Sequence, residues 1–191
     1  MTVRAIATVG DPVLRQRSPE VTQAELHSPE VQRLIDDLIE TKRAARGAGL
    51  AANQISALAR IAVVEVDAGT RYAYKPLIPL TVIVNPTVEP LSDETLSINE
   101  GCLSVPDLRG DVDRLMEVRV RYLDRDGTPR ETVARGLTAG TFQHEVDHLD
   151  GVMFLDRVTD PRTFSTWEQF ERHHESDFLR RIAPYVREPS A

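Results

Sequence analysis

The chain has 191 residues, one cysteine and a formal net charge of −7, with 41% hydrophobic and 28% charged residues. This length and composition predict a single globular domain, and an acidic balance without a basic block argues against direct sequence-specific binding of nucleic acid. One cysteine excludes an intrachain disulfide and no apolar run approaches the length of a membrane span, so we expect a cytoplasmic protein with no membrane partner.

The first clear element is an amphipathic helix that begins at Ser28-Pro29 and ends before Gly47. Serine is a favoured N-cap and proline a favoured first helical residue. Apolar residues then recur at helical spacing, at Val31, Leu34, Ile35, Leu38 and Ile39. We expect this helix to cover the core and to carry no chemistry.

Short runs rich in β-branched residues follow and predict strands at 60–67, 80–85, 116–123 and 131–134. The last two are joined by Asp126-Gly127, which is typical of a hairpin turn. Mostly antiparallel strands that flank one functional helix indicate an α+β fold, in which sheets surround that central helix.

The end of the chain predicts one further helix. Ser165 and Glu168 have the spacing of a capping box, and aromatic residues recur after them at roughly helical spacing. His173 and His174 lie in this stretch. Adjacent side chains on a helix point about 100° apart, so we interpret the pair as solvated residues that do not share a metal.

The predicted central helix contains Gln143–His148. Thr138 is the expected N-cap, and Gly151 stands where a left-handed C-cap would end the element. Phe142, Val146 and Leu149 form one stripe, which we expect to face the core. A second stripe of Leu137, Thr141, His144 and His148 is then expected to face a cleft.

Two histidines four residues apart lie on the same face of a helix, so His144 and His148 could bind one metal ion, with Glu145 beside it as a general base. The alternative is a solvated helix that carries two histidines by chance. A hydrolytic site needs a third protein ligand and one open position for water. Phe154 stands where one class of zinc peptidases has its third histidine, which leaves Cys102 as the strongest candidate.

Three motifs together resemble those of the peptide deformylase family. They are Gly47–Gln54, then Glu100–Ser104 followed by Pro106, and then Gln143–Leu149 followed by Gly151; the opening Gly10–Arg15 is also similar to the family's usual start. The resemblance implies one deformylase-like domain over residues 1–191, with about 160–191 as a C-terminal helical extension.

The implied activity is hydrolysis of the N-terminal formyl group of formyl-methionyl nascent peptides, which releases formate. Cys102, His144 and His148 would bind one divalent metal, for which the resemblance implies Fe²⁺, although the same ligands also suit zinc, nickel and cobalt. Glu145 would act as general base toward the attacking water and then as general acid toward the leaving amine. By resemblance, the side chain of Gln54 and the backbone N–H of Leu103 would stabilise the reacting carbonyl oxygen.

The resemblance also indicates the residues that would bind the peptide. Backbone groups at Ala48, Gly49 and Gly101 would hold it as an added strand, and Arg109 matches a position beside the next part of the substrate. The methionine pocket would be formed by Ala48, Ile98, Leu137, Gly140 and Thr141, with His144 at its edge. Some family members dock on the ribosome near the exit tunnel through a C-terminal helix, which here has mixed charges.

Ala48, Asn53 and Gly140 depart from the residues that are common in the family. Ala48 and Gly140 are smaller than usual and are expected to widen the pocket and to alter its side-chain preference. Four alternatives stand beside this reading: a zinc peptidase with another third ligand, a cysteine hydrolase that pairs Cys102 with a histidine, a non-enzymatic protein with a structural metal, and a deformylase for other formylated substrates.

Overall fold

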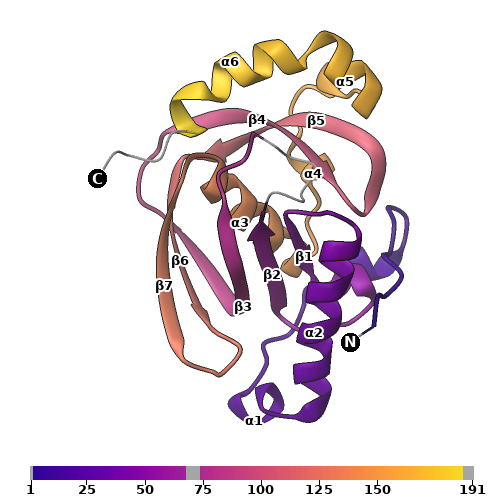
Figure 1. Cartoon of the computed structure of the whole chain (residues 1–191), viewed down its shortest axis with the longest axis vertical. Helices are drawn as coiled ribbons and strands as arrows, with labels where there is room; N and C mark the ends of the chain where they lie inside the picture. The colour runs from indigo at the N-terminus through magenta and orange to yellow at the C-terminus, as the bar shows by residue number, and fades with distance from the viewer. Residues whose placement is uncertain (1, 68–73, 187–191) are drawn as a thin grey trace.

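The computed structural model describes residues 2–67 and 74–186, and the last part of the predicted C-terminal extension, 187–191, lies outside the described residues. Two antiparallel sheets surround helix α3 (Gly136–Leu149), which contacts strands of both sheets. Helix α2 packs beside β1 and β2, whereas α5 and α6 lie at the opposite end of the molecule, over β4 and β5 (Figure 1). The predicted α+β class is confirmed.

The larger sheet has the strand order β1-β2-β3-β6-β7, and each neighbouring pair is antiparallel. Its strands are β1 (Gly49–Ala51), β2 (Ile61–Val66), β3 (Ile78–Pro90), β6 (Glu117–Leu123) and β7 (Pro129–Arg135). The four predicted strands are all present, although β3 is longer than expected. Gly127, in the predicted hairpin turn, has a φ of 77°, a conformation that glycine adopts without steric cost.

The smaller sheet is the hairpin of β4 (Thr95–Cys102) and β5 (Val105–Leu115). The sequence analysis did not predict these strands, because their polar and charged residues show no simple alternation. The register shifts between Gly101 and Cys102, where the pairing of Gly101 with Arg109 gives way to that of Cys102 with Val105. The hairpin therefore presents Cys102 at the very end of a strand.

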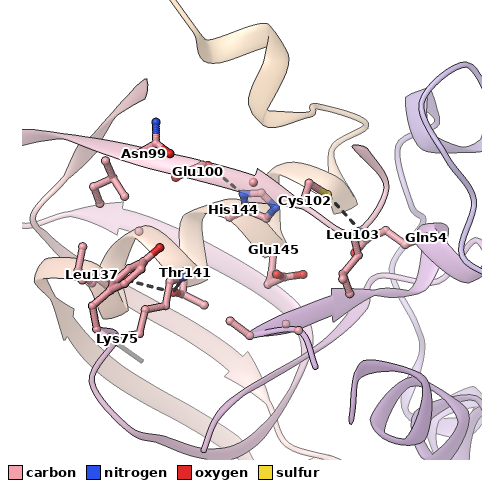
Figure 2. Close-up of a pocket in the computed structure, with 17 residues that line it drawn as sticks. Gln54, Lys75, Asn99, Glu100, Cys102, Leu103, Leu137, Thr141, His144 and Glu145 are labelled. Carbon is pink, nitrogen blue, oxygen red and sulfur yellow. Dashed lines mark hydrogen bonds and ion pairs between the residues drawn. The ribbon is translucent and has the colours of Figure 1, made fainter. Parts of the chain in front are cut away.

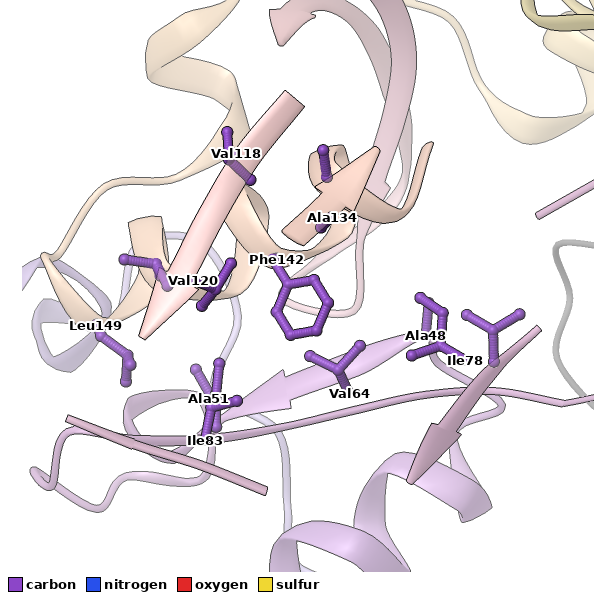
Figure 3. Close-up of a cluster of buried hydrophobic side chains, with 14 residues drawn as sticks. Ala48, Ala51, Val64, Ile78, Ile83, Val118, Val120, Ala134, Phe142 and Leu149 are labelled. Carbon is purple, nitrogen blue, oxygen red and sulfur yellow. The ribbon is translucent and has the colours of Figure 1, made fainter. Parts of the chain in front are cut away.

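Helix α3 packs its apolar stripe on the larger sheet. Phe142 and Leu149 meet Val118, Val120 and other buried residues of the strands in one cluster (Figure 3). The expected N-cap at Thr138 is wrong, because the N-cap lies three residues earlier, at Arg135, which makes no side-chain capping hydrogen bond. The expected end is confirmed, since Gly151 has a φ of +75° and directly follows the C-cap residue Asp150.

Helix α2 (Pro29–Ala44) begins as predicted, since the Ser28 Oγ accepts a hydrogen bond of 3.2 Å from the Val31 N–H. Its apolar face, which includes the fully buried Ile35 and Leu38, packs with residues of β1, β2 and β3. The remaining short elements are η1 (Pro12–Arg15), α1 (Gln23–Leu26), η2 (Ala52–Ile55), α4 (Phe154–Arg157) and η3 (Pro161–Thr163).

The C-terminal segment forms two helices where one was predicted, α5 (Trp167–His173) and α6 (Glu175–Val186). The predicted cap is wrong by one residue, because the side chain of Thr166 accepts from the Gln169 N–H. His173 and His174 are exposed, as expected. Across the described ranges, no helix combines the length and the apolar composition that crossing a bilayer requires.

Candidate metal centre

A pocket opens between β1, β4 and α3, and it collects residues from all three sequence motifs (Figure 2). Of the residues proposed from sequence, all except His148 and Arg109 line it. The lining consists of Gly47, Ala48, Gly49, Gln54, Tyr74, Lys75, Ile98, Asn99, Glu100, Gly101, Cys102, Leu103, Leu137, Gly140, Thr141, His144 and Glu145.

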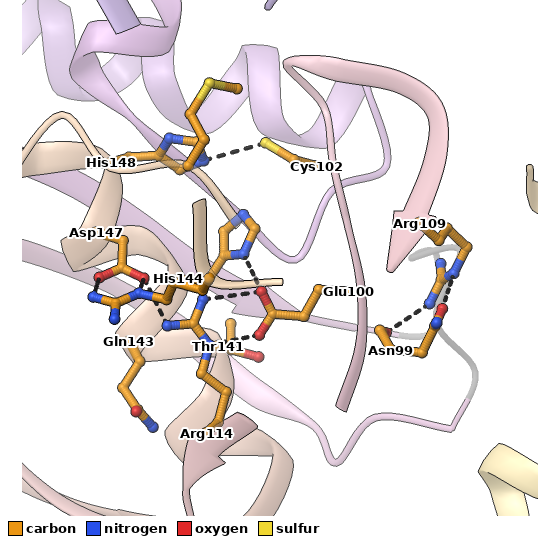
Figure 4. Close-up of polar contacts among 12 residues, drawn as sticks. Asn99, Glu100, Cys102, Arg109, Arg114, Thr141, Gln143, His144, Asp147 and His148 are labelled. Atoms are coloured by element: carbon orange, nitrogen blue, oxygen red, sulfur yellow. Dashed lines mark hydrogen bonds and ion pairs between the residues drawn. The ribbon is translucent and has the colours of Figure 1, made fainter. Parts of the chain in front are cut away.

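Cys102, His144 and His148 converge beside this pocket. One ligand atom from each of the three residues lies within 4.8 Å of the other two, and the Cys102 Sγ is 3.2 Å from the His148 Nε2 (Figure 4). The helix supplies both imidazoles one turn apart, and the end of β4 supplies the sulfur. One thiolate and two imidazoles are a ligand set that suits a first-row divalent metal, so the residues present fit such an ion.

The environment of Cys102 favours the thiolate that a metal requires. Burial would raise the pKa of this thiol, but the charges and hydrogen bonds of His148 and His144 outweigh it and lower the pKa of Cys102 to about 5. The Ser104 N–H and the Gln54 Nε2 also donate to the Sγ, at 3.4 and 3.5 Å. The sulfur is therefore prepared to act as an anionic ligand.

Glu100 orients His144. Its Oε2 lies 2.9 Å from the His144 Nδ1, which leaves the other ring nitrogen for a metal. Burial would lower the pKa of His144, but the bonds to Cys102 and Glu100 raise it to about 10. Burial would raise the pKa of Glu100, but Arg114, which donates to both carboxylate oxygens, and His144 hold that pKa well below its usual range.

A second ring of charges supports these contacts. Arg114 also donates to Asp147 at 2.6 Å (Figure 4). Arg157 binds both oxygens of the same carboxylate at 2.5 Å. Asp147 is the residue between Val146 and His148, and it links the helix to the β4–β5 hairpin through Arg114. The sequence analysis named Glu100 and Asp147 as motif positions but assigned neither one a role.

Glu145 is 4% exposed, and its Oε2 has no hydrogen-bond partner. Burial raises the pKa of Glu145, against the opposing effect of the two histidines. Gly49 makes room for this carboxylate, because a Cβ at position 49 would lie 2.3 Å from the Glu145 Oε1. A buried carboxylate beside three metal ligands and facing a pocket is suited to proton transfer.

Gln54 and Leu103 lie on the opposite side of the pocket from Leu137 and Lys75 in the view of Figure 2. The Ala51 N–H donates to the Gln54 Oε1 at 2.9 Å, and the Gln54 Nε2 donates to the Ser104 Oγ at 3.0 Å. These contacts fix which end of the amide faces the sulfur. Leu103 packs close to Gly47, where an added Cβ would lie 2.7 Å from its Cδ1.

Arg109 does not line the pocket itself, but it contacts residues that do. It is fully buried, with its guanidinium 3.9 Å from the Trp167 ring centroid and 4.4 Å from that of Phe170. It donates to Asn99 and to the Tyr74 hydroxyl, and both of these residues line the pocket. Cation–π contacts with α5 could not be expected from the sequence, because they join segments distant in the chain.

The expected widening at Gly140 is wrong. A Cβ at this position would lie 2.9 Å from the Ile98 Cδ1, so the isoleucine side chain already occupies the space. Asn53 has a structural contact, since its Nδ2 donates to the His148 backbone oxygen at 2.6 Å. Phe154 stacks on His144 with ring centroids 6.4 Å apart.

The sequence analysis missed Tyr74, Lys75 and Asn99 as pocket residues. Lys75 donates from its Nζ to the Thr141 Oγ1 at 2.8 Å. No motif surrounds these residues, so no sequence signal pointed to Tyr74 or Lys75. Asn99 directly precedes the Glu100–Ser104 motif on β4, and its position beside that motif was the one signal available.

Three convergent protein ligands, a buried carboxylate next to them and an adjoining open pocket define a mononuclear metallohydrolase. The polypeptide deformylase family model matches residues 3–164. The peptide deformylase of Leptospira biflexa is 39% identical over 172 residues, which cover 90% of this chain and 96% of the relative. That of Thermomicrobium roseum is 44% identical over 163 residues, which cover 85% and 90% of the two chains.

Solved structures agree with these relatives. The class I type b peptide deformylase from Acinetobacter baumannii with Met-Ala-Ser bound matches with a TM-score of 0.78 and 38% identity, over 82% of this chain and 99% of that one. The chain belongs to the polypeptide deformylase family, the hydrolases that remove the formyl group from the amino terminus of a peptide.

Proposed function

We propose that this protein hydrolyses the N-formyl group of formyl-methionyl nascent peptides, with the roles of the individual residues as follows. The observation that carries the proposal is the convergence of Cys102, His144 and His148 beside the buried Glu145. The Acinetobacter baumannii relative is described with Met-Ala-Ser bound, and this tripeptide is what remains after formyl-Met-Ala-Ser loses its formyl group.

Cys102, His144 and His148 would hold one divalent cation, which in such a site polarises a carbonyl oxygen and lowers the pKa of a water molecule from 15.7 to about 7. We propose Fe²⁺ as the ion used in the cell, on the resemblance to the family. Zinc, nickel and cobalt fit the same ligands, and raw affinity does not favour iron over zinc. Metal analysis of protein purified without oxygen distinguishes these ions.

Glu145 accepts a proton from the attacking water and passes it to the departing amine. Water adds to the formyl carbon, the carbon–nitrogen bond breaks, and the products are formate and a peptide with a free amino terminus. The partnerless Oε2 of Glu145 and the raised pKa of its carboxyl support this role, because a base that works near neutral pH needs a pKa near that pH.

The Gln54 side-chain amide and the Leu103 backbone N–H stabilise the negative charge that develops on the formyl oxygen. Fixed donors are effective because they need no reorientation during the reaction, and the loss of one such donor costs about 3 to 4 kcal/mol of transition-state stabilisation. The contacts that hold Gln54 to Ala51 and Ser104 provide such fixation.

The peptide lies as an added strand between β1 and β4. Both are edge strands of their sheets, and both line the pocket with Ala48, Gly49 and Gly101 at or next to their ends. Edge strands offer backbone groups to an extended peptide. The first side chain then enters the part of the pocket formed by Ile98, Leu137, Gly140 and Thr141.

Three further proposals rest on the resemblance and on composition. Residues 1–191 act as one domain with an extension from about residue 160, the protein works in the cytoplasm, and it meets its substrates near the ribosomal exit tunnel. The family model ends at residue 164, which agrees with an extension beyond that point. Co-sedimentation of the full chain with ribosomes at low salt tests the docking prediction. A chain that stays in the supernatant under these conditions refutes it.

The activity is tested by following formate release from formyl-Met-Ala-Ser, with acetyl-Met-Ala-Ser as the matched control. We expect release from the formyl peptide, and we expect the acetyl peptide to remain intact. In parallel, Cys102→Ala should lose the metal. Retention of a full metal complement by that variant would indicate a different third ligand and would contradict the proposed site.

A further inference from the structure

Arg109 connects the C-terminal helix α5 to the strand that lines the pocket. Its side chain packs on Gly101 of β4, where an added Cβ would lie 3.5 Å from the Arg109 Cγ. The guanidinium lies over two aromatic rings of α5, with its Cζ 3.9 Å from the ring centroid of Trp167 and 4.4 Å from that of Phe170. The arginine side chain is therefore held between α5 and β4.

The donors of Arg109 are directed at two residues that line the pocket. Its Nε donates to the Asn99 Oδ1 at 2.7 Å, and its Nη2 donates to the Asn99 backbone oxygen at 2.9 Å (Figure 4). The Nη2 also donates to the Tyr74 hydroxyl at 3.1 Å. One planar guanidinium thus fixes both the side chain and the backbone of Asn99, two residues before Gly101 on β4.

Helix α6 holds the same two pocket residues through other contacts. The Asn99 Nδ2 donates to one oxygen of Asp111 at 2.6 Å, and Arg181 of α6 pairs with the other oxygen at 3.0 Å. The Tyr74 ring packs edge to face on Phe178 of α6, with ring centroids 5.2 Å apart. Both C-terminal helices therefore support the wall of the pocket that contains Asn99 and Tyr74.

The position of the guanidinium excludes a direct role in binding the peptide. Arg109 is fully buried, and it is not among the described residues that line the pocket. A peptide could reach it only if α5 or β4 moved away. Asn99 and Gly101 do line the pocket, and they belong to the edge strand on which the peptide is proposed to add. A change at Arg109 would therefore reach the peptide through β4.

We propose that Arg109 is a positioning residue, which α5 holds in place and which fixes the peptide-binding edge of β4 without contacting the peptide. The fork of the guanidinium sets several hydrogen bonds at fixed angles, and the aromatic faces behind it restrict its movement. An edge that is ordered in advance binds a peptide at a lower entropic cost. The proposal rests on the proposed deformylase function and concerns how the same site binds its substrate.

The test measures kcat and KM for formate release from formyl-Met-Ala-Ser, and the dissociation constant of Met-Ala-Ser by calorimetry, with the metal-loaded full chain. Arg109→Met keeps a long side chain but removes the donors, so KM and the dissociation constant should both rise roughly 10-fold. We expect kcat and metal content to stay close to wild type, because Cys102 pairs with Val105 beyond the register shift in β4. A rise in KM at constant kcat indicates lost binding and not a lost chemical step.

Trp167 distinguishes positioning from general structural support. It is half-buried and is not among the described residues that line the pocket. Trp167→Ala should raise KM roughly 2- to 5-fold, and Trp167→Phe, which keeps an aromatic face, should restore most of the loss. If Trp167 acts through Arg109, then Trp167→Ala should not raise KM further in the Arg109→Met background.

Leu26→Ala is the control for lost stability. Leu26 is fully buried in α1, which lies at the opposite end of the molecule from α5 (Figure 1). This variant should lower Tm and leave KM unchanged.

The outcomes are distinct. A wild-type KM in Arg109→Met overturns the positioning role, and so do effects of the two single variants that multiply in the double variant. If Arg109→Met folds poorly, a wild-type KM in Trp167→Ala overturns it instead. A metal-loaded wild type that releases no formate from formyl-Met-Ala-Ser overturns the deformylase function, on which the proposal rests.

Discussion

Gly49→Ala is predicted to disable the protein through Glu145. An added Cβ at this position would lie 2.3 Å from the Glu145 Oε1, 2.5 Å from its Cδ and 2.7 Å from its Cγ. Glu145 is buried, so it cannot simply swing into solvent, and the carboxylate must be displaced by roughly 1 Å to reach normal contact distance. A displacement of that size costs about 100-fold in rate, and overpacking costs about 1 to 3 kcal/mol of stability.

The assay combines kcat for formate release, metal content and the free energy of unfolding. We expect Gly49→Ala to keep its metal while kcat falls by about 100-fold or more. Gly101→Ala is the matched control for stability and metal content, because the nearest atom to its added Cβ is 3.5 Å away, which is ordinary contact. A Gly49→Ala variant with wild-type kcat would refute the claim that position 49 sets the place of the carboxylate.

Three other predictions concern the metal ligands and the C-terminal helices. Glu100→Gln removes the charge that orients His144, so metal affinity in a chelator competition should fall by about 10- to 100-fold; unchanged affinity would contradict this role. The pKa of Cys102 is lowered to about 5 and that of His144 is raised to about 10, so metal binding at pH 7 should release a proton from His144. Calorimetry of metal binding in buffers of different ionisation enthalpy measures this release. Metal binding without proton release would show that the imidazole of His144 is already neutral. Removal of residues 165–191 should lower Tm, because each apolar side chain that α5 and α6 bury is worth about 1.5 to 3 kcal/mol, and an unchanged Tm would mean that these helices are peripheral.

The periodic elements could be predicted from the sequence because their pattern is local. The apolar spacing of α2 and the alternation of β6 report directly which face is buried, and both elements form where expected. The β4–β5 hairpin was missed because the charges of Glu100, Arg109 and Arg114 hide its pattern. These charged side chains are buried because Arg114 pairs with Glu100 and Arg109 stacks on an aromatic ring. Only the folded chain brings these partners together.

The metal ligands were predictable for a different reason. His144 and His148 are fixed by one helical turn, and Cys102 is the one thiol in the chain. Lys75 carries no such constraint, since it reaches Thr141 from 66 positions away in the chain. The space beside Gly140 was also misjudged, because an absent side chain says nothing about the neighbour that fills the gap.

The most direct test of the account compares wild type with Glu145→Ala after purification without oxygen, with metal content and formate release measured on the same samples. We expect about one metal ion per chain in both proteins, with formate released from formyl-Met-Ala-Ser by the wild type alone. Full activity in Glu145→Ala, or a fully loaded wild type that releases no formate from any formyl peptide, would contradict the proposed mechanism.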